Sequence, residues 1–73
     1  MKRKATPDVS NFSMIVELTE RASTLAIEAL THSEAGRPNA AIGALIEVNQ
    51  LLSDAGALGA AAIILYRRTA LSR

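Results

Sequence analysis

Residues 41–52, AIGALIEVNQLL, decide the fold of this chain of 73 residues. Wound as an α-helix at about 100° per residue, the segment spreads its apolar side chains over an arc of about 220°. The remaining polar strip is narrow and consists of Gly43, Glu47, Gln50 and Asp54. A helix that packs on one neighbour needs an apolar stripe of only about 100°. The pattern therefore predicts a central helix with neighbours on two or more sides.

A second long helix is predicted before this segment, from about residue 11 to residue 35. Several of its apolar residues alternate three and four positions apart, which is the spacing at which packed helices meet. These residues are Ile15, Leu18, Ala22, Leu25 and Ala29. We expect Ser10 or Ser13 to cap the helix, because a serine hydroxyl accepts a hydrogen bond from a free amide of the first turn. Further apolar residues make this helix, too, wider than one partner can cover.

The sequence Gly36-Arg37-Pro38-Asn39 separates these two helices. Glycine suits the left-handed position that follows a helix, and proline suits the first turn of the next helix. A connection this short forces the two helices into an antiparallel hairpin.

The segment 53–56, SDAG, allows two interpretations. Gly56 either ends the central helix and a third helix covers residues 57–71, or Gly56 and Gly59 lie inside one long helix at a cost of roughly 1 kcal/mol each. We favour the break, which gives helices at about 11–35, 38–54 and 57–71.

Residues 36–42, GRPNAAI, and the apolar spacing that follows them resemble the turn and second helix of a tetratricopeptide repeat. Leu25 and Ala29 fall where the first helix of that repeat keeps a large and a small residue, whereas Glu28 and His32 stand where it prefers apolar ones. The match covers one unit, and repeat arrays need about three units to be stable alone. We interpret it as convergence on an α-hairpin. Membership would imply binding of a peptide or protein on a concave helical face.

Composition predicts an all-α fold that assembles with itself. Hydrophobic residues make up 49% of the chain but aromatic residues only 3%, so a core would consist mainly of Ala, Leu and Ile. Alanine and leucine are strong helix formers. A chain this small commonly needs disulfides, a metal, very good packing or oligomerisation, and this one contains no cysteine. We therefore expect an antiparallel hairpin with a third helix, assembled as a dimeric helical bundle.

The formal net charge of +1 hides basic ends and an acidic middle. We expect residues 1–9 to form a flexible basic arm and residues 10–73 to form one helical domain. The residues that could contact phosphate groups are Lys2, Arg3, Lys4, Arg67 and Arg68. A solubilising tail and a solvated helix end explain the same charges, so a dimeric nucleic-acid-binding regulator is the alternative function.

The sequence lacks the parts of a catalytic or metal site. It has no cysteine and no glycine-rich phosphate loop, and His32 is its one imidazole. Glu28 and His32 are four residues apart and could form a metal site only if a twofold dimer brought two such pairs together. An exposed histidine that favours the negative end of the helix dipole is the simpler explanation. We expect no enzyme activity, no cofactor and no metal.

The leading hypothesis is a non-enzymatic protein–protein interaction module, a small regulator, adaptor or inhibitor that acts as a homodimer. The predicted interface consists of Ile15, Leu18, Leu25, Ile42, Leu45, Ile46, Asn49 and Leu52. Asn49 lies within the apolar arc of the central helix, where it either is buried and specifies pairing or reaches water at the edge. The partners of the protein would be a second copy of the chain and an unidentified protein.

We expect a cytoplasmic protein without a membrane span. No apolar segment follows the basic start. The most apolar run, residues 55–66, is about a dozen residues long, whereas a span needs about 20.

Overall fold

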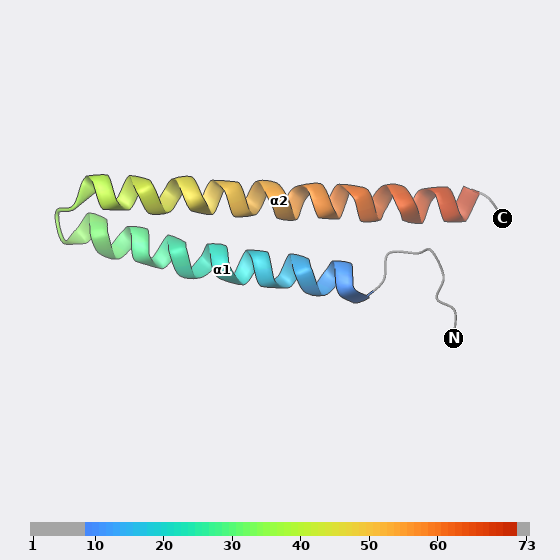
Figure 1. Cartoon of the computed structure of the whole chain (residues 1–73), viewed down its shortest axis with the longest axis horizontal. Helices are drawn as coiled ribbons and strands as arrows, with labels where there is room; N and C mark the ends of the chain where they lie inside the picture. Colours follow the sequence, from blue (N-terminus) through green and yellow to red (C-terminus); the bar gives the residue numbers. More distant parts are fainter. Residues whose placement is uncertain (1–8, 72–73) are drawn as a thin grey trace.

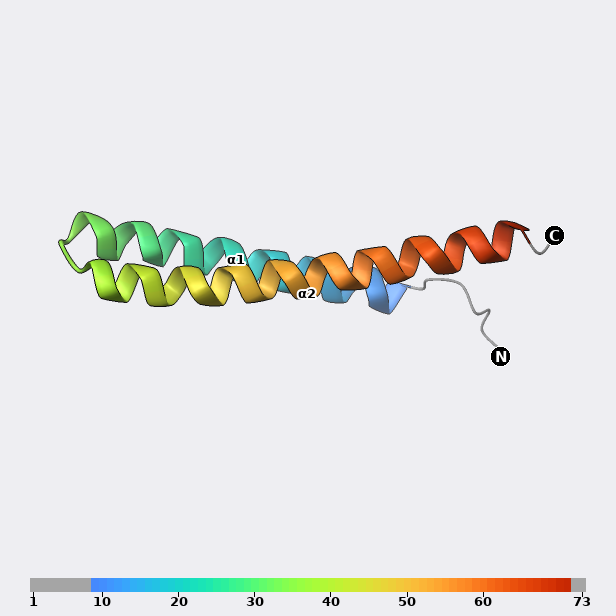
Figure 2. The same cartoon turned by 90° about the horizontal axis from the view of Figure 1, so that it is seen from above.

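The computed structural model describes residues 9–71, which form two α-helices joined by a tight turn (Figure 1). Helix α1 spans Val9–Glu34 and helix α2 spans Pro38–Leu71. The two helices run antiparallel and lie side by side in Figure 1, and the view from above shows α2 crossing in front of α1 (Figure 2). The predicted all-α hairpin is confirmed.

The turn forms as its sequence predicts. Gly36 adopts a φ of 76°, the left-handed conformation that glycine tolerates best. The amide of Arg37 donates to the carbonyl of His32 at 2.8 Å, and the amide of Gly36 donates to the carbonyl of Ser33 at 3.1 Å. These two bonds make a Schellman motif, which satisfies carbonyls at the end of α1. Pro38 then opens α2, where its missing N–H costs nothing.

The third helix predicted for residues 57–71 does not form, because α2 continues without a break through Gly56 and Gly59. A break there would leave four amides and four carbonyls without helical partners. The surrounding alanines and leucines favour helix strongly enough to offset two glycines. The described part of the chain is therefore a two-helix hairpin.

Helix α1 begins two residues earlier than predicted, at Val9. Ser10 and Ser13 consequently lie inside the helix, and the prediction that one of them occupies the capping position is wrong. Residues 1–8 of the predicted arm lie outside the described residues, and residue 9 is helical.

The two helices meet along a seam of alanine residues. The buried residues are Ala22 and Ala29 of α1 and Ala41, Ala55 and Ala62 of α2. Larger residues, half-buried, flank these alanines at spacings of three and four. On α1 they include Ile15, Leu18, Leu25 and His32, and on α2 they include Val48, Leu51 and Leu58. The predicted spacing of α1 is thus confirmed as its packing face.

The hairpin has one layer and a small core. Its radius of gyration is 16.9 Å, whereas a compact domain of this length would have about 11 Å. Its shortest dimension is 11 Å, which is the thickness of one helix. In the described chain, no side chain larger than alanine is buried. The apolar width that the sequence predicts for both helices therefore stays largely uncovered.

Candidate interaction surface

Each helix carries further rows of side chains on the two sides of the seam. Residues seven apart point in nearly the same direction, so each row can be followed along the helix. One side consists of apolar and small polar residues, and we call it the open face. On α1 the open face comprises Val9, Phe12, Val16, Thr19, Ser23, Ala26, Leu30 and Ser33. On α2 it comprises Pro38, Ile42, Leu45, Asn49, Leu52, Gly56, Gly59, Ile63 and Tyr66.

The opposite side of the seam holds charged residues, and we call it the charged face. Its ionisable residues are Glu17, Arg21, Glu28, Glu47, Asp54 and Arg68. The side-chain amide of Gln50 on this face donates to Asp54 at 3.2 Å. Within the described residues, the open face carries no Asp, Glu, Lys or Arg. The hairpin therefore has one uncharged surface and one charged surface.

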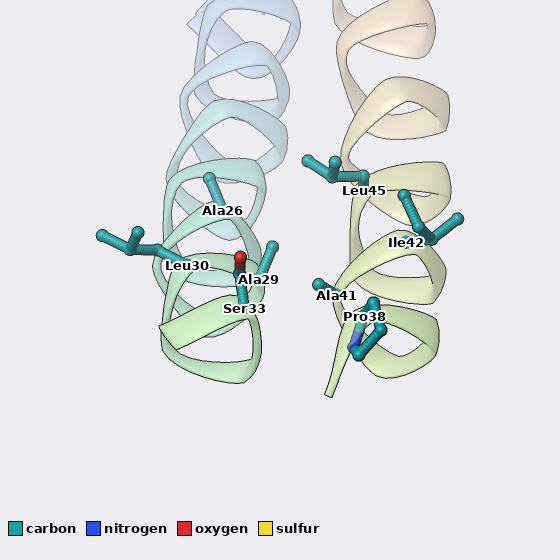
Figure 3. A pocket seen from close by; sticks show the side chains of 8 residues that line it. All are labelled: Ala26, Ala29, Leu30, Ser33, Pro38, Ala41, Ile42 and Leu45. Atoms are coloured by element: carbon teal, nitrogen blue, oxygen red, sulfur yellow. The ribbon is translucent and has the colours of Figure 1, made fainter. Parts of the chain in front are cut away.

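A groove of about 390 Å³ hollows the open face at its turn end (Figure 3). Ala29 and Ala41 face one another across the seam in this region, while Leu45 extends from α2 toward α1. Leu30 and Ile42 point outward from the two helices. Apart from Ser33, the lining side chains are apolar. The groove suits an apolar side chain from another molecule.

Large apolar side chains remain exposed along the rest of the open face. Phe12 is 55% exposed, Leu52 is 50% exposed and Tyr66 is 67% exposed. Contiguous apolar surface of this kind marks interaction sites in soluble proteins.

The structure divides the predicted interface residues among three places. Those half-buried in the seam between the two helices are Ile15, Leu18 and Leu25. Those exposed on the open face are Ile42, Leu45, Asn49 and Leu52. Ile46 lies on the outer side of α2, away from α1, and is 67% exposed.

The side chain of Asn49 is exposed in the hairpin, so of its two predicted environments the single chain shows the solvated one. The division into an open face and a charged face was not predicted from the sequence. A seven-residue register signals it, but only once the seam residues of both helices are known.

His32 lies in the last turn of α1, as predicted, but it is half-buried rather than exposed. Its Nδ1 atom accepts a hydrogen bond from Nε of Arg37 at 3.2 Å, which ties the end of α1 to the turn. Residues 9–71 hold no group of three or more Asp, Glu, His or Cys residues that could bind a metal ion.

Of the predicted phosphate-contacting residues, the structure describes Arg67 and Arg68. Lys2, Arg3 and Lys4 lie outside the described residues. Arg67 and Arg68 are exposed near the end of α2, in the part that extends past the start of α1 (Figure 2).

Helix α2 is the one described helix that is long and apolar enough to cross a membrane by length and composition. Its most apolar window of 18 residues has a mean hydropathy of 1.4, and only 11% of that window is buried in the hairpin. The core helix of a soluble protein passes the same test when its partner covers it.

Comparison with protein families, with curated proteins and with solved structures finds no match to this chain.

Proposed function

We propose that this protein is a non-enzymatic helical interaction module that acts as a homodimer. The observation that supports the proposal is the uncharged open face, which runs along both helices and is uncovered in the single hairpin. Two hairpins that pack through this face form a four-helix bundle with the charged faces outside.

The small core of the hairpin favours assembly. Its five buried residues are all alanine, and burying one methyl group contributes only about 0.8 kcal/mol. Folding costs roughly 1–2 kcal/mol per ordered residue in backbone entropy alone. Covering the leucine, isoleucine and phenylalanine side chains of the open face supplies apolar burial that the seam does not.

A second copy suits the open face better than lipid does. Glu47 and Asp54 lie on the charged face of the same helix that carries the apolar window. Inside a bilayer each carboxylate would cost several kcal/mol unless it were paired. In a dimer, both carboxylates stay in water on the outer surface.

The proposed role follows from this arrangement. The dimer presents two rigid charged faces and occupies a site on a target protein in the cytoplasm, as a small regulator, adaptor or inhibitor would. The proposed mechanism is masking of that site by a charged face.

Light scattering on the purified chain, at several concentrations, tests the proposal. We expect a mass of two chains. Leu45→Asp places a charge on the open face and should shift the mass to one chain or unfold the protein. Ala57→Asp adds the same charge at an exposed position beside the charged face and should leave the dimer intact.

A helical wild-type chain that stays monomeric at all concentrations would refute the proposal. Flotation of the wild-type chain with liposomes, without a dimer in detergent-free buffer, would identify lipid as the occupant of the open face instead.

A further inference from the structure

We propose that the second copy packs on the open face head to tail. The turn of each hairpin then lies over the start of α1 and the end of α2 of the other. The inference rests on the proposed homodimer and adds its register. It is carried by the distribution of large and small residues along the open face and by the unequal lengths of the two helices.

Gly56 and Gly59 are the first observation. Glycine is among the poorest formers of a helix interior, yet both glycines lie within α2. A Cβ atom built on either would meet nothing within 4 Å, so the hairpin itself does not require them to be small. Both lie on the open face, where their missing side chains leave room for another molecule.

Along the row that contains Gly59, a larger and a smaller residue lie at equal distances on the two sides of Leu52, so the row fits its own reverse in a second copy. Its residues recur every seven positions and are Pro38, Leu45, Leu52, Gly59 and Tyr66. A twofold axis across α2 at Leu52 reverses this row. Leu45 then packs into the space at Gly59 of the second copy, and Pro38 packs against Tyr66 of the second copy.

Helix α1 shows the same relationship at the level of the same axis. Counting outward from the turn, with Glu34 opposite Pro38, Thr19 lies opposite Ser53, one residue from Leu52. Phe12 and Ala26 are each seven residues from Thr19. The axis therefore brings the exposed ring of Phe12 over the small Ala26 of the second copy, so that large residues meet small ones on both helices.

A head-to-head dimer, with both turns at one end, would also pair large residues with small ones, because Phe12 would lie over Gly59 and Leu45 over Ala26 of the second copy. The helix lengths decide between the two registers. Helix α2 has 34 residues and α1 has 26, so the last turns of α2 have no α1 beside them (Figure 2).

Tyr66 lies in these last turns and is 67% exposed, while Ile63 lies where they begin, level with Val9 of α1, and is 55% exposed. A head-to-head dimer leaves Tyr66 without a described residue of α1 to cover it. The head-to-tail dimer places the turn end of the second copy, with Pro38 and Ile42, over Ile63 and Tyr66. This register therefore covers Tyr66, which the head-to-head register leaves exposed.

Cysteine cross-linking tests the register, because the chain has no cysteine of its own. Leu45→Cys and Gly59→Cys chains are mixed, unfolded and refolded together, and treated with a short thiol-specific cross-linker. We expect a covalent heterodimer, identified by its mass. Each variant alone should not cross-link, since its two cysteines would be about 21 Å apart along the axis. Leu52→Cys alone should cross-link to itself.

The mixture of Ala26→Cys and Leu45→Cys chains is the matched control, and we expect no cross-link from it. A cross-link in this mixture and none between positions 45 and 59 would establish the head-to-head register and overturn the inference, while the homodimer would stand. A dimer by light scattering that forms none of these cross-links would overturn the use of the open face. A monomer would refute the proposed function itself.

A second pair of variants tests the space at Gly59 without cross-linking. Gly59→Leu fills the space that Leu45 of the second copy needs, so we expect self-association at least about tenfold weaker. Gly43→Leu adds the same side chain to α2 on the other side of the seam, where a Cβ atom also meets nothing within 4 Å. It should leave the dissociation constant within about twofold. Equal effects of the two variants, both helical by circular dichroism, would contradict the register.

Discussion

Ala29 of α1 and Ala41 of α2 face one another across the seam next to the turn, and both are buried (Figure 3). Because each presents only a methyl group, the two helices can approach closely where the turn joins them. The same closeness leaves no room between the helices for Leu45 and Ile42, which remain on the open face. The alanine seam and the exposed apolar face are thus two consequences of one packing arrangement.

Enlarging this alanine pair should destabilise the hairpin. For Ala29→Leu we expect a loss of about 1–3 kcal/mol in the free energy of unfolding, because an overpacked core must move its helices apart or strain its side chains. Urea denaturation at fixed protein concentration measures the change. Ala60→Leu adds the same volume at an exposed position of α2 and should change stability by less than about 0.5 kcal/mol. Equal losses for the two variants would contradict the seam.

The glycines of the turn and of α2 should respond oppositely to alanine. Gly36→Ala forces an L-residue into a φ of 76° and should cost about 1–2 kcal/mol. Gly43→Ala replaces a helical glycine whose added Cβ meets nothing, so it should stabilise by roughly 0.5–1 kcal/mol. Thermal unfolding followed by circular dichroism measures both. A melting temperature raised by Gly36→Ala would show that the turn does not adopt the left-handed conformation.

Asn49 should govern the uniqueness of assembly more than its strength. It is the one carboxamide on the described open face, at the centre of the apolar surface of α2. A polar residue among apolar ones in a helical interface selects a register at some cost in stability. We expect Asn49→Leu to raise the melting temperature and to produce a mixture of oligomers in sedimentation velocity. A single species with the wild-type mass would contradict this role.

The melting temperature itself should depend on protein concentration. A homodimer that dissociates as it unfolds gains stability by mass action, so its melting temperature rises with the total concentration of the chain. We expect a steady increase between micromolar and millimolar solutions of the wild-type protein, and a smaller increase for Leu45→Asp if it remains folded. A melting temperature independent of concentration would indicate a hairpin that is stable on its own.

The turn and the α1 packing face are predictable from local sequence alone. Gly36 and Pro38 act through their own backbone preferences, which do not depend on distant residues. The spacing of three and four from Ile15 to Ala29 reflects the helical period itself. Both features can therefore be predicted without knowledge of any contact between the helices.

Gly56 shows where local signals mislead. A glycine near a Ser-Asp pair is typical of a helix end. Helix α2 nevertheless continues, because residues on both sides of Gly56 belong to the same seam with α1. Leu51 precedes Gly56 and Leu58 follows it at the spacing of that seam. Propensity at one position is smaller than the cost of disrupting the hydrogen bonds of a long helix.

By itself, the sequence determined that the chain is helical, that the segments before and after the turn at Gly36 pair antiparallel, and that they carry more apolar side chains than one contact can bury. Those features depend on residue types, their spacing and the length of one turn. Only the tertiary structure decided which apolar side chains are left over, because that depends on which rows of the two helices face each other. By placing alanines in the seam and every charged residue of segment 9–71 away from one side, that choice created the open face on which the proposed function depends.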